Sequence, residues 1–478
     1  MKKIHTIAVL ASSAVLAGVV IVSCTSFSSG PDTTGTGGAT GMGTGGDTSG
    51  GTGGVPVTTG AGGSTDTGSG GSTTTGSGGS TTTGSGGATA ATGGRTGAGG
   101  AAAGTGGATG AGGAVAASGV CDILAAAGNP CAAAHSTTRV LVSKYTGPLY
   151  QVCKGAEAAG PNSCPGGAAA IKDIPSLNGY ADASVQDTFC AGATCTISII
   201  YDQSGNANLL KPSPKGGNGP ANLPAIATAL PIKINGHSVY GVYIRKNQGY
   251  RAGCNGCAVV TPKMTATGDQ PETEYMVTSQ SNLIDGCCFD YGNAETSSND
   301  DGNGTMEAVY FGGGVAWGTG AEGGHGPNNS PTLNPWVMAD LENGLFAGFS
   351  TTNPSNTQQI SSNTAIHANF VTALIIGDSC TGVAGCGTSP TAKAGGRFAI
   401  LGGDATTGTL KTMYDGIRPT LPGYVPMKKQ GSIILGTGGD NSDQSEGEWF
   451  EGVMASGAAS AGTVAAVQAN IVAAKYGQ

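Results

Sequence analysis

Short apolar runs that alternate with polar positions recur along the chain from about residue 139, and most are bounded by Gly, Asn, Asp or Pro. Period-two alternation with turn residues nearby is typical of half-buried β-strands. The runs predicted as strands are 139–142, 196–201, 238–244, 275–277, 306–311, 398–401 and 432–435. Many short strands with glycine-rich turns predict an all-β fold, an antiparallel β-sandwich of the concanavalin or jelly-roll type.

Helical patterns are few. One or two short helices are predicted between residues 124 and 134, interrupted at 128–130 by Gly-Asn-Pro. Near the end of the chain, Val464, Val467 and Ile471 fall on one face of a helix. We therefore expect a sandwich with only a few short helices.

The first residues have the layout of an export signal. Lys2 and Lys3 precede an apolar run over 7–22, which is followed by Cys24. The small residue before this cysteine also resembles the lipobox of bacterial lipoproteins. We predict a lipoprotein signal peptide over 1–23, lipid on Cys24, and an outer-membrane or cell-surface location; plain secretion and an uncleaved anchor are the alternatives.

Residues 24–118 consist almost entirely of Gly, Thr, Ser and Ala, and the run Gly-Ser-Gly-Gly-Ser-Thr-Thr-Thr occurs twice. No aromatic residue lies between Phe27 and Tyr145, so the segment has little to bury against the entropy of ordering. It is predicted to be a disordered tether with a reach on the order of 50 Å. The remainder, 119–478, is long enough for one domain with a full core.

Thirteen cysteines are present, and twelve remain if Cys24 carries lipid. An exported protein meets an oxidising compartment in which thiols pair. The short spacings predict the bonds Cys121–Cys131, Cys153–Cys164, Cys190–Cys195, Cys254–Cys257, Cys287–Cys288 and Cys380–Cys386. A bond between neighbours closes almost no loop, so the Cys287–Cys288 bond must act locally, by stiffening a turn and presenting an apolar sulfur face to a ligand.

The net charge and its distribution limit the kinds of ligand that the domain can bind. A net charge of −8 with only 10% charged residues leaves no basic patch for nucleic acid. The polar residues are mainly Asn, Ser, Thr and Gly, which suit a neutral ligand such as carbohydrate. Neither a cofactor nor a metal is predicted, because the histidines show no ligand spacing: His135, His237, His325 and His367.

Two segments offer carboxylates for chemistry. Read as a strand, the run 335–344 places Asp340 and Glu342 on one face, about 7 Å apart. A surface face or a bound cation is the alternative. The apolar run 432–435 leads through glycines to Asp440, where an Asx turn or a calcium loop with Asp443, Glu446 and Glu448 is the alternative.

Glycoside hydrolysis requires two carboxyl groups that flank the scissile bond. Glu342 and Asp440 could supply them, with Trp317, Trp336 and the cysteine pair as apolar walls. A serine-esterase interpretation of Ser379 is disfavoured, because the domain lacks a Gly-x-Ser-x-Gly elbow. The Cys254-x-x-Cys257 pair favours a structural bridge over zinc or redox chemistry.

Seven motifs resemble the catalytic domain of glycoside hydrolase family 54, the α-L-arabinofuranosidases best known from fungi. They lie at 121–123, 134–139, 147–152, 201–205, 286–295, 338–344 and 467–476. The resemblance extends in order over essentially the whole of Val120 to Gln478.

This resemblance implies a β-sandwich and a retaining mechanism that releases terminal non-reducing L-arabinofuranose from arabinan or arabinoxylan. It makes Glu342 the nucleophile and Asp440 the acid/base, with carboxyl groups roughly 5 to 5.5 Å apart. It makes the Cys287–Cys288 bond a surface that packs on the sugar. Around the same subsite it places Trp317, Asp340, Asn343 and Gly439.

Fungal members also carry a C-terminal arabinose-binding trefoil that has no counterpart in this sequence, so we expect weaker binding to insoluble polysaccharide. The expected partner is an arabinose-containing plant polysaccharide or oligosaccharide. We expect a monomer that meets the membrane only through its lipid. The rival hypothesis is a non-catalytic, lectin-like carbohydrate-binding lipoprotein, which the presence of both Glu342 and Asp440 disfavours.

Overall fold

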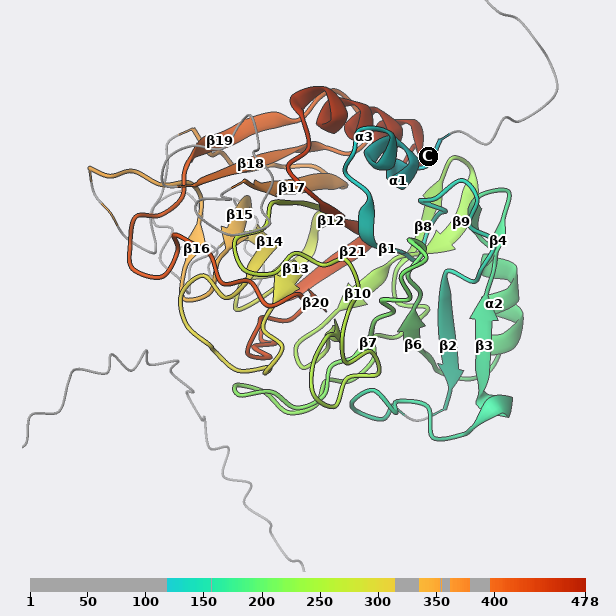
Figure 1. Ribbon diagram of the computed structural model, residues 1–478. Coiled ribbons are helices and arrows are strands. Elements are labelled where there is room, and N and C mark those ends of the chain that lie inside the picture. Colours follow the sequence, from blue (N-terminus) through green and yellow to red (C-terminus); the bar gives the residue numbers. More distant parts are fainter. Residues whose placement is uncertain (1–117, 156, 314–334, 353, 355–361, 379–395) are drawn as a thin grey trace, which may run out of the picture. The chain divides into compact units, whose positions relative to one another are not determined.

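The computed structural model describes residues 118–478 except 156, 314–334, 353, 355–361 and 379–395 (Figure 1). By its internal contacts the chain divides into two units, Met1–Gly104 and Thr105–Gln478, and the described residues belong to the second. The predicted signal peptide, the tether, Cys24, Trp317 and the Cys380–Cys386 pair therefore lie outside the described residues.

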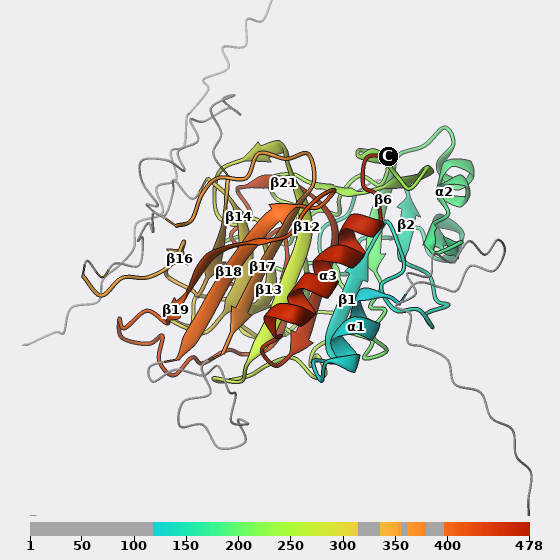
Figure 2. The ribbon, with the colours of Figure 1, turned by 90° about the horizontal axis from the view of Figure 1, so that it is seen from above.

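Two seven-stranded antiparallel sheets form the body of the domain (Figures 1 and 2). The first has the order β1-β21-β12-β17-β18-β19, and β10 also pairs with β21. Its strands are β1 (Cys131–Ser136), β10 (Val242–Ile244), β12 (Glu272–Ile284), β17 (Val371–Gly377), β18 (Arg397–Asp404), β19 (Lys411–Ile417) and β21 (Glu446–Ser456). The centre of this sheet, β12 between β17 and β21, joins segments from distant parts of the sequence.

The second sheet has the order β16-β15-β14-β13-β20-β11-β7. Its strands are β7 (Lys211–Pro212), β11 (Tyr250–Ala252), β13 (Asp290–Ala294), β14 (Glu307–Gly312), β15 (Trp336–Asp340), β16 (Leu345–Phe346) and β20 (Ser432–Leu435). Pairing of β13 with β20 brings the segment after Cys288 beside the strand that leads to Asp440.

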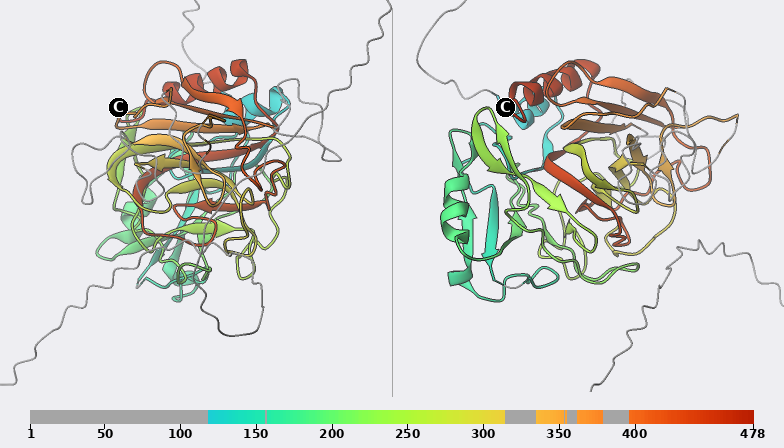
Figure 3. Two further views of the ribbon diagram at one scale, coloured as in Figure 1. Left: turned by 90° about the vertical axis from the view of Figure 1, so that its left-hand side faces the viewer. Right: turned by 180° about the vertical axis from the view of Figure 1, so that it is seen from behind.

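Smaller elements flank the two sheets (Figure 3). They are the three-stranded sheet of β2 (Tyr150–Lys154), β3 (Ile171–Ile174) and β6 (Cys195–Ile200), the pair β4 (Ser176–Leu177) and β5 (Tyr180–Ala181), the pair β8 (Pro231–Ile234) and β9 (His237–Tyr240), the 3-10 turn η1 (Ala168–Ala170), and the helices α1 (Val120–Ala126), α2 (Ala183–Cys190) and α3 (Ala461–Ala473). Helices α1 and α3 contact each other. No helix in the described part of the chain is both long and apolar enough to cross a membrane.

The core lies between the two large sheets, where β14 packs on β12 and β17 and β15 packs on β17 and β18. Alternation along β15 is as predicted: Val337 and Ala339 join this core, whereas Trp336 and Met338 join a separate buried cluster with Cys288 on the other face of the sheet. The predicted antiparallel sandwich is confirmed.

Local predictions near the N-terminal end need correction. The helix ends at Ala126, and the residues from Cys131 onward form strand β1, not a second helix. Pairing of β1 with the buried strand β21 outweighs the helical propensity of its alanines. The predicted strand 139–142 is also wrong, because Arg139 makes only an isolated bridge to Tyr180.

Two further differences have local causes. Helix α2 was not predicted; its signal is Asp182, whose carboxylate accepts a hydrogen bond from the backbone N–H of Ser184. The predicted strand 238–244 is divided at Gly241 into β9 and β10. A side chain at 241 would meet the ring of Phe450 at 2.7 Å, so the chain can pass there only as glycine.

Candidate active site

A pocket lies beside the outer face of the second sheet. It is lined by Cys287, Cys288, Asp300, Asp340, Glu342, Asn343, Gly344, Leu345, Gly438, Gly439, Asp440 and Ser442. These residues come from the start of β13, the loop before β14, the β15–β16 turn and the loop after β20. Trp336, predicted as an apolar wall, is instead completely buried and does not line the pocket. Trp317 lies outside the described residues, and every other residue predicted around the sugar lines this one pocket.

Glu342 lies in the tight turn that joins β15 to β16, not on the strand itself. The turn is closed by a hydrogen bond from Leu341 N–H to the Gly344 carbonyl, 3.2 Å long. Glu342 and Asn343 have φ angles of +62° and +55°. The prediction that Asp340 and Glu342 share a strand face is thus wrong, because the strand ends at Asp340 and the backbone turns left-handed.

The left-handed turn is held from three sides. The Glu342 N–H donates to Asp340 Oδ1 at 3.1 Å, and the buried Tyr424 hydroxyl donates to the Glu342 carbonyl at 2.8 Å. Asn343 Nδ2 donates to Asp300 Oδ1 at 3.0 Å. A non-glycine residue in this conformation costs on the order of 1 kcal/mol, and such strain concentrates at functional sites.

Asp440 follows β20 in the turn that the glycines at 436, 438 and 439 permit. Both the backbone N–H of Ser442, at 2.9 Å, and the Ser442 hydroxyl donate to Asp440 Oδ1. Asn218 Nδ2 in turn donates to Ser442 Oγ at 3.1 Å, and the Asn218 N–H donates to the Asp440 carbonyl at 2.9 Å. The Asx turn named as an alternative is present, and it aims the carboxylate at the pocket.

The calcium alternative has less support, because three neighbouring carboxylates already accept hydrogen bonds from protein groups. These pairs are Asp443 with Asn222, Glu446 with Tyr243, and Glu448 with Asn282.

The bonded cysteines Cys287 and Cys288 form another part of the pocket wall, beside the turn that carries Asp440. Cys288 N–H donates to the Ser442 carbonyl at 3.3 Å, and Gln444 N–H donates to the Cys287 carbonyl at 2.8 Å. The pair is therefore fastened to the loop that carries Asp440. Cys288 is buried and Cys287 is half-buried, so the pocket is presented with an uncharged sulfur face.

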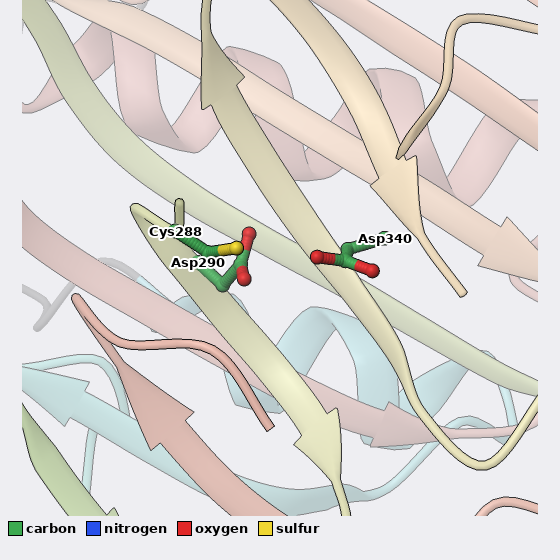
Figure 4. Close-up of side chains that lie close together, drawn as sticks. All are labelled: Cys288, Asp290 and Asp340. Atoms are coloured by element: carbon green, nitrogen blue, oxygen red, sulfur yellow. The ribbon is translucent and has the colours of Figure 1, made fainter. Parts of the chain in front are cut away.

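A group of acidic residues surrounds the pocket floor. Figure 4 shows the Cys288 sulfur and the Asp290 carboxylate directed toward Asp340, and ligand-type atoms of the three lie within 4.8 Å of one another. A disulfide sulfur is not the thiolate that metals bind, so this set is a weak cation site. It is better described as two buried carboxyl groups within 4.8 Å of the Cys288 sulfur.

Burial strongly raises the pKa values of the acids in this group. Burial, and then Glu295 and Asp340, raise the pKa of Glu342 well above its ordinary value. Burial also raises the pKa of Asp340 to about 7. Burial, followed by the charge of Asp340, raises the pKa of Asp290 well above normal. The pocket thus holds several carboxyl groups that do not all ionise together near neutral pH.

Three of these acids, Asp290, Glu295 and Asp300, are not among the residues predicted from the sequence. Asp290 and Glu295 flank strand β13, immediately after the cysteine pair. Their position next to the Cys287–Cys288 turn, itself a candidate part of a ligand site, was a signal in the sequence that could have identified them as site residues. Asp300 lies in a polar turn that gives no such signal.

The remaining cysteines lie away from the pocket lining. The structure contains the predicted bonds Cys121–Cys131, Cys153–Cys164, Cys190–Cys195 and Cys254–Cys257 in addition to the vicinal one. His135 is buried and contacts the Tyr291 hydroxyl at 3.0 Å and the Asn208 carbonyl at 2.8 Å, which is a structural role.

Comparison with known proteins gives consistent matches. The family model "Alpha-L-arabinofuranosidase B, catalytic" matches residues 120–477. A probable α-L-arabinofuranosidase B of Aspergillus terreus is 47% identical over 365 residues, which cover 75% of this chain and 62% of that protein. An α-L-arabinofuranosidase of Hypocrea jecorina is also 47% identical, over 75% of this chain and 63% of its own length.

Solved structures agree with the sequence matches. An arabinofuranosidase in complex with arabinofuranosyl-α-1,2-xylobiose superposes with a TM-score of 0.62 at 42% identity, covering 75% of this chain and 65% of that one. A glycoside hydrolase family 54 enzyme soaked with a cyclic sulfate inhibitor gives the same TM-score at 43% identity, covering 75% and 66%. The chain spans about 62% of the length of the curated relatives named above. It belongs to the family of α-L-arabinofuranosidase B catalytic domains, glycoside hydrolase family 54.

Proposed function

We propose that the protein is an exo-acting, retaining α-L-arabinofuranosidase. The observation that carries the proposal is the single pocket in which Glu342, Asp440 and the vicinal cysteine bond meet. A furanose is small and uncharged, as is the pocket's sulfur wall, and two carboxyl groups are what glycoside hydrolysis requires.

In the first step, Glu342 attacks the anomeric carbon of the terminal arabinofuranose while Asp440 protonates the departing oxygen. The C1–oxygen bond of the substrate breaks, and a bond forms between C1 and a Glu342 oxygen. The left-handed turn at Glu342 supports this role, because its backbone is fixed by Asp340 and Tyr424 before substrate arrives.

In the second step, Asp440 removes a proton from water, which attacks C1 and releases Glu342. Arabinose leaves with its anomeric configuration retained after two inversions. The Ser442 hydrogen bonds keep one oxygen of Asp440 occupied, so its other oxygen is available for proton transfer.

Binding of the sugar is proposed for the residues around these two. Cys287 and Cys288 would form the floor beneath the ring, and Asp340, Asn343 and Gly439 would contact its hydroxyl groups, with Trp317 as a further wall. Arabinan- or arabinoxylan-type chains are the proposed substrates, supported by the xylobiose-linked arabinofuranose bound to the relative described above.

The decisive experiment is hydrolysis of 4-nitrophenyl α-L-arabinofuranoside by the full chain beside Glu342→Gln and Asp440→Asn. We expect activity in the parent alone, and a methyl α-L-arabinofuranoside as the product when methanol is added. If both variants kept the parental activity, the roles assigned to Glu342 and Asp440 would be wrong. Sugar binding by a parent protein that hydrolyses no arabinofuranoside would favour the lectin-like alternative.

Export and anchoring through lipid on Cys24 are proposed with the enzyme function. The five disulfide bonds among the described residues support export, because such bonds persist in oxidising compartments. Metabolic labelling with palmitate should mark the parent chain and not Cys24→Ser. Label on both would show that this cysteine is not the attachment point.

A further inference from the structure

Glu295 is a completely buried carboxylic acid directly after strand β13. Its Oε1 accepts a hydrogen bond from the Thr305 hydroxyl at 2.6 Å. Among the described residues no hydroxyl or N–H group donates to its other oxygen, Oε2. A buried carboxyl oxygen without a donor is costly unless it carries a proton or faces one.

Gly439 shows what Oε2 of Glu295 faces. A Cβ atom at position 439 would overlap Oε2 of Glu295 and would lie 3.1 Å from Oε2 of Glu342. Both carboxyl oxygens therefore approach the same small volume above Gly439. Only glycine leaves room for this approach.

Glu295 is fixed in this position by its backbone as well as by Thr305. The buried guanidinium of Arg251 donates to the Glu295 carbonyl at 3.2 Å and also to the Gly439 carbonyl. These bonds tie the end of β13 to the loop after β20. Because the backbone is held at both places, the Glu295 side chain has little freedom to move away from Glu342.

Glu295 and Glu342 lie too close together in a buried setting for both carboxyl groups to be ionised at once. Burial raises the pKa of both Glu295 and Glu342, and the hydrogen bond between the two carboxyl groups raises the pKa of Glu342 further while it lowers that of Glu295. The charged and titratable groups that surround the pair are Arg251 on β11, Asp290 on β13, Asp300 before β14, Asp340 on β15 and Asp440 after β20. Four of these five are acids, so the surroundings favour one proton on the pair.

We propose that Glu295 is a positioning residue that shares one proton with Glu342 and takes up that proton as the sugar is attacked, so that the nucleophile is ionised and aimed at the sugar. The inference rests on the proposed function of Glu342. Glu295 does not line the pocket, so it acts through Glu342 and not on the substrate.

The two steps of the reaction use this hydrogen bond differently. Positive charge developing at C1 favours the arrangement with the proton on Glu295 and the negative charge on Glu342. When Glu342 is later released from C1, the same donor stabilises the departing carboxylate. The proton stays within the pair in both steps, so no additional acid or base is needed.

The test compares Glu295→Gln, which keeps a donor, with Glu295→Leu, which keeps the bulk and removes it. With an aryl α-L-arabinofuranoside we expect Glu295→Gln to retain kcat within about fivefold, with the acidic limb of kcat/KM moved to lower pH. Loss of a well-placed donor in Glu295→Leu should reduce kcat on the order of 100-fold with KM little changed. Parental kcat and pH profile in Glu295→Leu would overturn the inference, as would an equal loss in both variants.

Glu274→Gln is the matched control. Glu274 on β12 is also fully buried, and among the described residues no hydroxyl or N–H group donates to either of its carboxyl oxygens, but it lies against the carboxyl group of Glu272 and does not line the pocket. Its substitution should leave the pH profile unchanged. Melting curves identify any variant that fails to fold. If Glu295→Leu fails to fold, the Glu295→Gln variant decides by itself: an acidic limb of its kcat/KM profile at the parental pH would overturn the inference.

Side-chain ¹³C NMR of glutamate carboxyls separates this inference from the proposed function, because it requires no turnover. One proton should persist on the Glu295–Glu342 pair well above the ordinary glutamate pKa, and Glu295→Gln should abolish that shared titration. Ordinary titration of both carboxyls would overturn the inference even if the enzyme is active. A parent protein that shows the shared proton but cleaves no arabinofuranoside would instead contradict the proposed function.

Discussion

The buried acids of the pocket and the buried Glu307 on β14 have opposite electrostatics. At the pocket, Glu342 and Asp340 lie among other acids, and burial raises the pKa of each. On the inner side of β14, Glu307 is equally buried, which would raise its pKa, but it lies 2.8 Å from Arg418 and 2.7 Å from Lys429. Those two cations hold its pKa at about 2.

The difference shows that burial alone does not decide what a carboxylate does. A buried acid paired with cations stabilises the fold, because removal of one partner strands the other charges. An unpaired acid in the pocket is retained at a cost in stability and is free to exchange protons or attack carbon. Substitutions in the two groups should therefore move stability and activity in opposite ways.

The largest effect is expected for Glu342→Gln. The rate should fall on the order of 10⁴-fold, because the proposed nucleophile is lost, while the melting temperature rises because a repelled buried acid becomes neutral. Steady-state kinetics and calorimetry on the same preparation measure both. A variant that is inactive and less stable than the parent would break the comparison.

Glu307→Gln should have the reverse effect. It leaves Arg418 and Lys429 without their shared partner, and breaking a buried pair costs roughly 3–5 kcal/mol. Denaturant unfolding gives the free energy, and kcat per folded molecule should remain near the parental value. Unchanged stability would mean that the cluster contributes nothing to the fold.

The double substitution Cys287→Ala, Cys288→Ala removes the neutral wall of the pocket without altering a charge. We expect KM to rise about tenfold, with a smaller change in kcat, because apolar contact with the sugar is lost, at roughly 1–2 kcal/mol for such a surface. Initial-rate kinetics test this. Parental KM and kcat would show that the pair only forms a turn.

The smallest effect is expected in the pH dependence of stability. The folded pKa of Asp340, about 7, exceeds its unfolded value of 3.8, so protons bind the folded state more tightly and stability falls as pH rises from about 4 to about 7. Glu307 has a folded pKa of about 2 against 4.5 unfolded, so its contribution is present above pH 4.5 and is lost toward pH 2.

Together these shifts predict maximal stability near pH 4–5. Asp340→Asn should flatten the decline between pH 4 and 7 and leave the acid side unchanged, which urea unfolding at a series of pH values would measure. A neutral-side slope identical to that of the parent would show that Asp340 does not carry it.

Much of the fold could be predicted because it depends on local pattern. The run 432–435 is strand β20, and the alternation along 336–340 separates core from pocket as expected. Prediction failed where distant partners decide. The stretch from Cys131 has a helical composition, but its pairing with β21 makes it a strand. Glu342 would share a face with Asp340 only if β15 continued to residue 342, and the backbone turns there instead.

The site, too, could be predicted only where its residues belong to local motifs. Glu342 and Asp440 belong to motifs that a sequence shows whole, whereas Glu295 becomes meaningful only when the loop after β20 is in place. The register of β13 with β20 sets Ala294 opposite Ser432, and the loop that follows β20 returns so that Gly439 lies against the Glu295 carboxyl group and close to that of Glu342. No local pattern contains a contact between segments so far apart in the sequence.

The link from Asn218 through Ser442 to Asp440 has a consequence for how such an enzyme can diversify. Asn218 lies in the glycine-rich loop 215–219, on a different segment from the Glu342 turn. Substitutions there would alter the proposed proton delivery by Asp440 while the residues proposed to bind arabinose stay as they are. The proposed proton transfer and the proposed sugar contacts thus rest on separate segments, and substitution can change one without the other.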